Sequence, residues 1–95
     1  MISKQQLAFR LLELSNTFVT LCELKDIALA AKRLNLSSQE VAAQLQELEK
    51  KLALRLFVNP GKYSLLTRDG QDYYDRIVMP IDSIRQIKKP LSQND

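Results

Sequence analysis

The sequence predicts a mostly helical α+β domain in which one β-hairpin interrupts a series of helices. Over most of the chain, apolar residues recur at alternating spacings of three and four, the period of an amphipathic helix. The stretch LFVNPGKYSLL is different, because two apolar runs flank a Pro-Gly pair and indicate two strands joined by a tight turn. We therefore expect three helices before the hairpin and one long helix after it.

The first helix is expected to run from Ser3 to about Leu24. Ser3 and Gln6 have the spacing of a capping box, in which each side chain bonds the backbone N–H of the other residue. Three poor helix formers, Ser15-Asn16-Thr17, interrupt the pattern, so two helices divided by a cap at Ser15 or Asn16 are the alternative. The apolar stripe of this segment consists of Leu7, Leu11, Leu14, Phe18 and Leu21.

The next two helices are expected to form a helix-turn-helix. Asp26 can cap a short alanine-rich helix, and Asn35 tolerates the left-handed backbone that ends it. Ser37 and Glu40 then form a second capping box at the start of a helix over residues 38–51. Its buried face is predicted to carry Val41, Leu45, Leu48 and Leu52. Its outward face is predicted to carry Ser38, Gln39, Ala42, Ala43 and Gln46.

The hairpin is expected over residues 56–66, with Pro60-Gly61 at the centre of a type II turn. A hairpin that follows a helix-turn-helix is the wing of a winged helix. The sequence therefore predicts a winged helix-turn-helix with long N- and C-terminal helices.

The last helix is expected over residues 68–89, capped by Thr67. Gly70 in its first turn permits close approach of another element, and Pro80 should kink the helix because its ring collides with the carbonyl of Arg76. A domain of 95 residues has little core left to cover the apolar stripe of this helix. We therefore expect a homodimer formed by Leu7, Leu11, Leu14, Tyr74, Ile77, Ile81 and Ile84.

The composition offers little for catalysis. The chain has no histidine, one cysteine and two glycines, so it lacks the usual metal sites, nucleophile–base arrangements and phosphate-binding loops. Asp69, Asp72 and Asp75 are better read as a solvated helix face whose charge offsets the helix dipole. Cys22 lies between leucines, which favours a buried thiol over a redox switch. We expect no enzyme activity, no cofactor and no metal.

Net charge and hydropathy limit which partners and which cellular location the chain can have. Fourteen Lys and Arg residues against eleven Asp and Glu residues give a net charge of +3, which permits a polyanionic partner without requiring one. No apolar run is long enough to span a membrane, and the first residues lack the pattern of a signal peptide. The expected location is cytoplasmic, without membrane contact.

The run from Phe18 to Gly70 resembles the N-terminal DNA-binding domain of the LysR-type transcriptional regulators. The matching pieces are FVTL, AAKRLNLS, QLQELEKKLALRLF and LLTRDG, and they align without a gap over 53 residues. The resemblance implies a regulator that binds double-stranded DNA. The chain departs from the family at Ser38-Gln39, where Gln-Pro is usual, and at Ala42 and Ala43, where Ser and Arg are usual. Asn59 replaces an arginine that usually contacts a phosphate.

Two functions follow from these departures. In the first, the outward glutamines bond base edges, the alanines contact thymine methyl groups, and nearby cations contact phosphates. The expected DNA-binding residues are Ser38, Gln39, Ala42, Ala43, Gln46, Lys32, Arg33, Lys50, Asn59, Lys62 and Arg68. In the second, Glu40, Glu47 and Glu49 repel phosphates, and the domain is a degenerate protein-interaction module that pairs with another regulator.

The chain is expected to be a single domain over residues 1–95. Residues 3–67 would form the helix-turn-helix and wing, residues 68–89 a linker and dimerisation helix, and residues 90–95 a tail. The large effector-binding domain of the family has no counterpart in this sequence, and we expect a complete small protein.

Overall fold

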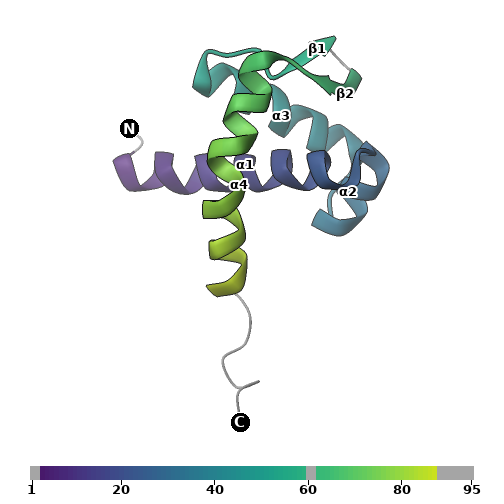
Figure 1. Cartoon of the computed structure of the whole chain (residues 1–95). Helices are drawn as coiled ribbons and strands as arrows, with labels where there is room; N and C mark the ends of the chain where they lie inside the picture. The colour runs from purple at the N-terminus through teal and green to yellow at the C-terminus, as the bar shows by residue number, and fades with distance from the viewer. Residues whose placement is uncertain (1–2, 60–61, 88–95) are drawn as a thin grey trace.

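The computed structural model describes residues 3–59 and 62–87 and has a winged-helix architecture. α1 and α4 cross, and α3 lies with the hairpin on one side of α1 (Figure 1). The predicted α+β fold, mostly helical with one hairpin, is confirmed. The elements are α1 (Lys4–Leu24), α2 (Ile27–Leu34), α3 (Ser38–Leu52), β1 (Phe57–Asn59), β2 (Lys62–Leu66) and α4 (Arg68–Ile87).

α1 is one unbroken helix, so the alternative of two helices divided at Ser15 or Asn16 is wrong. The capping box of Ser3 and Gln6 starts it, as predicted. Ser15 and Thr17 are buried, and each forms a hydrogen bond with a residue of another helix. Ser15 Oγ lies 2.5 Å from Tyr73 Oη, and Thr17 Oγ1 donates to Gln44 Oε1 at 2.5 Å. These long-range bonds offset the low helix propensity of serine and threonine.

The helix-turn-helix has the predicted caps. Asp26 Oδ1 accepts from the backbone N–H of Leu29, and Asn35 ends α2 in the left-handed region with φ 59°. Ser37 and Glu40 form the capping box of α3, with bonds of 3.0 and 2.9 Å. α3 therefore starts at a fixed place and in a fixed direction after the turn.

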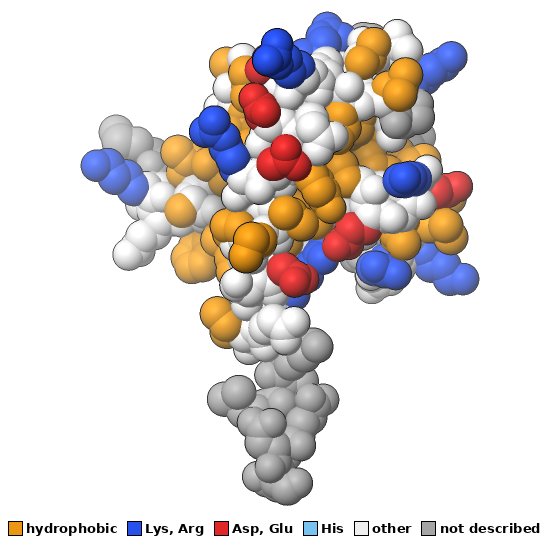
Figure 2. Space-filling view, in the orientation of Figure 1, with side chains coloured by type: hydrophobic (Ala, Val, Ile, Leu, Met, Phe, Trp, Pro, Cys, Tyr) orange, Lys and Arg blue, Asp and Glu red, His pale blue; other side chains and the backbone are white. Residues whose placement is uncertain are grey.

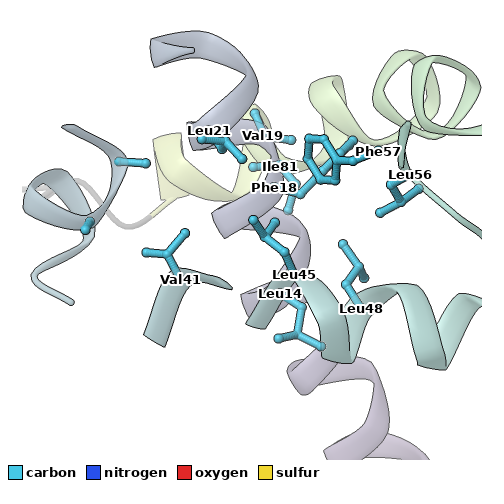
Figure 3. Packing of buried hydrophobic residues seen from close by; sticks show 12 residues of the cluster. Leu14, Phe18, Val19, Leu21, Val41, Leu45, Leu48, Leu56, Phe57 and Ile81 are labelled. Carbon is cyan, nitrogen blue, oxygen red and sulfur yellow. The ribbon is translucent and has the colours of Figure 1, made fainter. Parts of the chain in front are cut away.

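One hydrophobic cluster holds the helices and the hairpin together. Phe18 is fully buried at its centre, with ring centroids 5.8 Å from Phe57 of the hairpin and 5.7 Å from Tyr73 of α4. Figure 3 shows side chains of α1, α3, the hairpin and α4 converging on this point. The buried members are Leu14, Phe18, Val19, Leu21, Ala30, Ala31, Val41, Leu45, Leu48, Leu56, Phe57 and Ile81.

The hairpin is a two-stranded antiparallel sheet that is anchored to α3. Phe57 pairs with Leu66 and Asn59 with Lys62, and the register shifts between the two pairs. The carboxylate of Glu49 accepts from the backbone N–H of Leu56 at 2.7 Å and, more weakly, from that of Phe57 at 3.3 Å. The type II turn predicted at Pro60-Gly61 lies outside the described residues.

α4 begins against the hairpin. The side chain of Thr67 accepts from the backbone N–H of Gly70 at 2.9 Å, as expected for a cap. A Cβ on Gly70 would lie 2.2 Å from the carbonyl oxygen of Leu56, so only glycine allows this contact. The helix continues through Pro80 to Ile87.

The second half of α4 packs on α1, which corrects part of the dimer prediction. Leu14 is 0% exposed and Ile81 is 2% exposed, so both belong to the core of one chain and are not available to a second copy. The reason is that α4 folds back across α1, and Arg85 bonds the side chains of Asn16, Thr20 and Glu23 there. Leu11, Tyr74 and Ile77 are half-buried against the same core, Ile84 is half-buried, and Leu7 stays exposed.

Candidate nucleic-acid interface

The outward face of α3 is free of intramolecular packing. Ser38, Gln39, Ala43 and Gln46 are exposed, whereas Ala42 is half-buried at the edge of the face. The opposite face is held by Val41, Leu45 and Leu48, each 0% exposed. The helix thus presents a line of small and amide side chains to solvent.

The three glutamates of α3 have intramolecular partners. Glu40 bonds the backbone N–H of Ser37, and these bonds to Ser37 lower the pKa of its carboxyl group. Glu47 accepts two bonds from Arg10 of α1, at 2.6 and 2.9 Å, and lies 3.7 Å from the ammonium group of Lys51. Glu49 bonds the hairpin backbone. These contacts give each glutamate a role within the fold, and Arg10 and Lys51 also offset the charge of Glu47. The protein-interaction module stays a prediction.

Exposed cations lie on α3 itself and on three neighbouring elements. Lys32 and Arg33 are exposed in the last turn of α2, and Lys50 is exposed in the last turn of α3. Lys62 on β2 and Arg68 at the start of α4 are also exposed. Figure 2 shows Lys and Arg side chains around the end of the molecule that carries the hairpin. Within the part of the chain that the structure describes, the ion pairs engage Arg10, Lys51 and Arg85 and none of these five residues.

A shallow groove of about 460 Å³ separates the end of α3 from the hairpin. Asn59, Lys50 and Tyr63 all belong to its lining. Sequence reasoning did not single out Tyr63 or Leu54, because nothing in the local sequence indicates which side of the hairpin faces α3. The full lining is Gln46, Glu49, Lys50, Ala53, Leu54, Arg55, Phe57, Asn59 and Tyr63.

The predicted residues therefore fall into two groups in space. Gln39, Ala43 and Gln46 share the open face of α3, and Lys50 and Asn59 both line the groove beside it. The remaining cations lie on three other elements, Lys32 and Arg33 on α2, Lys62 on β2 and Arg68 on α4.

The sequence profile of the bacterial regulatory helix-turn-helix proteins of the lysR family matches residues 6–71. The chain belongs to this family. It is 31% identical over 71 residues to the HTH-type transcriptional regulator DsdC of Escherichia coli strain K12. That match covers 75% of this chain and 23% of DsdC, so the chain spans about a quarter of the length of this relative.

Three solved structures share the fold of this chain. Crystal structures of BenM_DBD with benA site 1 DNA and with catB site 1 DNA each match with a TM-score of 0.70 and 22% sequence identity. Each match covers 80% of this chain, and 85% and 82% of the respective BenM_DBD chain. A full-length BenM mutant matches with a TM-score of 0.69, and the match covers 25% of that chain.

The described part of this LysR-family chain shows neither a membrane helix nor a metal cluster. No described helix is long and apolar enough to cross a membrane. Among the same residues, no group of three or more Cys, Asp or Glu side chains is placed to hold a metal ion.

Proposed function

We propose that this chain is a small transcriptional regulator that binds double-stranded DNA through α3 and the hairpin wing. The observation that carries the proposal is the open face of α3 together with five exposed cations that form no ion pair within residues 3–59 and 62–87. In a helix-turn-helix, the second helix lies in the major groove and its outward side chains contact base edges. The lysR-family membership and the fold shared with BenM_DBD support the same use of α3.

In this proposal the cationic side chains contact DNA phosphates and do not contact base edges. Lys32 and Arg33 would contact the backbone on one side of α3, while Lys50, Lys62 and Arg68 would contact it on the other. Asn59, beside Lys50 in the groove, can donate its side-chain amide to a phosphate oxygen but adds no charge. Each neutralised phosphate releases counterions, so the affinity should fall steeply as salt rises.

The test is a band-shift titration of the full chain on duplex DNA at two salt concentrations. Lys62→Ala should weaken binding to all duplexes alike and lower the salt slope by about one. Lys4→Ala, which removes the same charge from the exposed start of α1, is the matched control and should change little. Absence of any shifted duplex at low salt would overturn the proposal and favour the protein-interaction module.

A second variant tests whether the face of α3 approaches DNA at all. Ala43→Arg places a cation on that face, where the family usually has arginine, and should strengthen binding to any duplex at low salt. Ala43→Met adds a side chain of similar length at the same position without the charge and serves as the control. If both variants bind like the wild type, the α3 face does not meet DNA.

We also propose that two copies pair through α4 and the start of α1. Phe9 is 68% exposed, and Met79 and Ile87 are each 75% exposed, although all three are large and apolar. Hydrophobic side chains gather along the N-terminal half of α1 and along α4 on the face shown in Figure 2. Pairing would bury them and bring two α3 helices to successive major grooves, about 34 Å apart.

Sedimentation of the full chain at micromolar concentrations tests the pairing. A dimeric mass is expected, and Met79→Asp should shift it toward the monomer because it buries a charge in the interface. Leu29→Asp changes an exposed apolar side chain on α2, outside the proposed interface, and should leave the mass unchanged. A monomeric wild type would contradict the pairing without affecting the DNA proposal.

A further inference from the structure

The side chains that α3 offers to a duplex lie in one line along the helix. Gln39, Ala43, Gln46 and Lys50 follow one another at spacings of four, three and four, and all four are exposed. Such spacings place residues on the same side of a helix. A base-reading surface on α3 therefore consists of an amide, a methyl group and a second amide, in that order, and Lys50 follows them as a phosphate contact.

This line lacks the groups that read guanine and cytosine. Guanine is usually read by arginine or lysine on its O6 and N7 atoms, and cytosine by a carboxylate that accepts from its N4 amino group. The described part of α3 has no cation before Lys50, which lies at the groove beside the hairpin. Its carboxylates are bonded to Ser37, to Arg10 and to the hairpin backbone.

The groups that are present suit adenine and thymine. A glutamine amide bonds adenine N6 and N7 together, and an alanine methyl group contacts the thymine methyl group. Gln39 and Gln46 are seven residues apart, which corresponds to about 10.5 Å along the helix. With α3 taken as parallel to the duplex axis, along which each base step rises about 3.4 Å, this distance is close to three base-pair steps.

α3 is held so that these positions are fixed relative to the rest of the domain. Arg10 donates a hydrogen bond to Glu47, and Thr17 donates one to Gln44. Glu49 accepts one from the backbone N–H of Leu56, next to the hairpin. Gln44 is half-buried and its amide oxygen is used by Thr17, so it is not part of the reading line.

We infer that the preferred DNA half-site has two A·T pairs about three base-pair steps apart, one read by Gln39 and one by Gln46. At least one thymine methyl group between them contacts Ala43. This inference rests on the proposed function, because it requires α3 to lie in the major groove.

Selection from a library of duplexes with a randomised centre tests the base preference. The full chain should enrich sequences with A·T pairs at two positions about three steps apart. Enrichment of G·C pairs at those positions, or uniform binding of all sequences, would overturn the inference while leaving the DNA proposal intact. Failure to retain any duplex at low salt would overturn both.

Single variants then assign each position to a residue. Gln39→Ala and Gln46→Ala should each lose roughly 5- to 150-fold of discrimination at one base pair only, and the two affected pairs should differ. Gln44→Ala is the matched control, because it removes the same amide from the same helix outside the reading line. Loss at the same base pair in both variants, or an equal loss in Gln44→Ala, would contradict the assignment.

The methyl contact is tested without changing the protein. Replacing a thymine of the selected site by uracil removes only the methyl group, and at the position facing Ala43 it should weaken binding roughly fourfold. Uracil at thymines outside the half-site should have no effect. Equal affinity for every uracil-substituted site would remove Ala43 from the reading line.

Discussion

The guanidinium group of Arg10 donates two hydrogen bonds to the carboxylate of Glu47 and so joins α1 to the outer part of α3. The bonds run from Nε to Oε2 at 2.9 Å and from Nη2 to Oε1 at 2.6 Å. Both side chains are more than a third exposed, at 38% and 35%, so solvent screens the pair. A double-mutant cycle with Arg10→Ala and Glu47→Ala should give a coupling of about 0.5–1 kcal/mol in the free energy of unfolding. Strictly additive effects would show that the pair does not hold the helices together.

The same pair makes stability depend on pH. The hydrogen bond from Arg10, with the positive charges of Arg10 and Lys51, holds the pKa of Glu47 below its ordinary value of 4.5. A lowered folded-state pKa contributes stability above pH 4.5, and that stability is lost as the pH falls through the folded-state pKa. The thermal midpoint of the wild type should therefore drop more steeply below pH 4.5 than that of Glu47→Gln. Parallel curves for the two proteins would contradict the assignment.

Gly70 should be the least replaceable residue at the junction of hairpin and α4. Alanine there would place its Cβ 2.2 Å from the carbonyl oxygen of Leu56, and this oxygen also accepts from the backbone N–H of Thr67. Relief requires movement of backbone, so Gly70→Ala should destabilise the domain by roughly 2 kcal/mol or more in urea unfolding. Ser83→Ala, at an exposed position of the same helix, should change stability by less than about 0.5 kcal/mol.

Ala53 is a site where glycine should stabilise the protein. It ends α3 in the left-handed region with φ 53°, which is unfavourable for a residue with a Cβ. Glycine removes this conformational cost but has greater entropy in the unfolded chain. The first effect is the larger, so Ala53→Gly should raise the free energy of unfolding by about 0.5–1 kcal/mol. The same substitution at Ala43, in the middle of α3, should lower it by about 1 kcal/mol. Equal signs at the two positions would contradict this account.

The thiol of Cys22 should be unreactive in the folded protein. Burial, assisted by the negative charge of Glu23, raises its pKa to about 12. Because the thiolate is the reactive form, alkylation at pH 8 should be on the order of a hundredfold or more slower in buffer than in denaturing urea. Similar rates in the two solvents would show that the thiol is accessible in the native state.

Local sequence patterns predicted the helix boundaries because the atoms that set them are close in sequence. Ser3, Asp26, Asn35 and Ser37 act on backbone groups within a few residues. For Gly70 the sequence indicated only that a close approach was permitted, and the fold shows that the neighbour is Leu56. The exposed face of α3 was predictable from local patterns too, since helical spacing alone places Gln39 and Gln46 opposite the buried leucines.

Contacts between distant residues were not predictable from local patterns. From the sequence alone, Glu47 and Glu49 were interpreted as charges that repel phosphates. Their partners, Arg10 and the backbone of Leu56, come close to them only in the folded chain. Leu14 and Ile81 were assigned to a dimer interface because a stripe indicates burial without saying what covers it. The base-reading and phosphate-binding roles stay predictions, since they depend on a partner that the chain alone does not contain.

Arg85 fixes how α4 lies on α1. Its guanidinium group bonds Asn16 and Thr20 at 3.0 Å and Glu23 at 3.1 Å, positions that span two turns of α1. Turning α4 about its own axis, or sliding it along α1, would disturb all of these bonds together. The crossing of the two helices is therefore held against both rotation and translation by a single side chain.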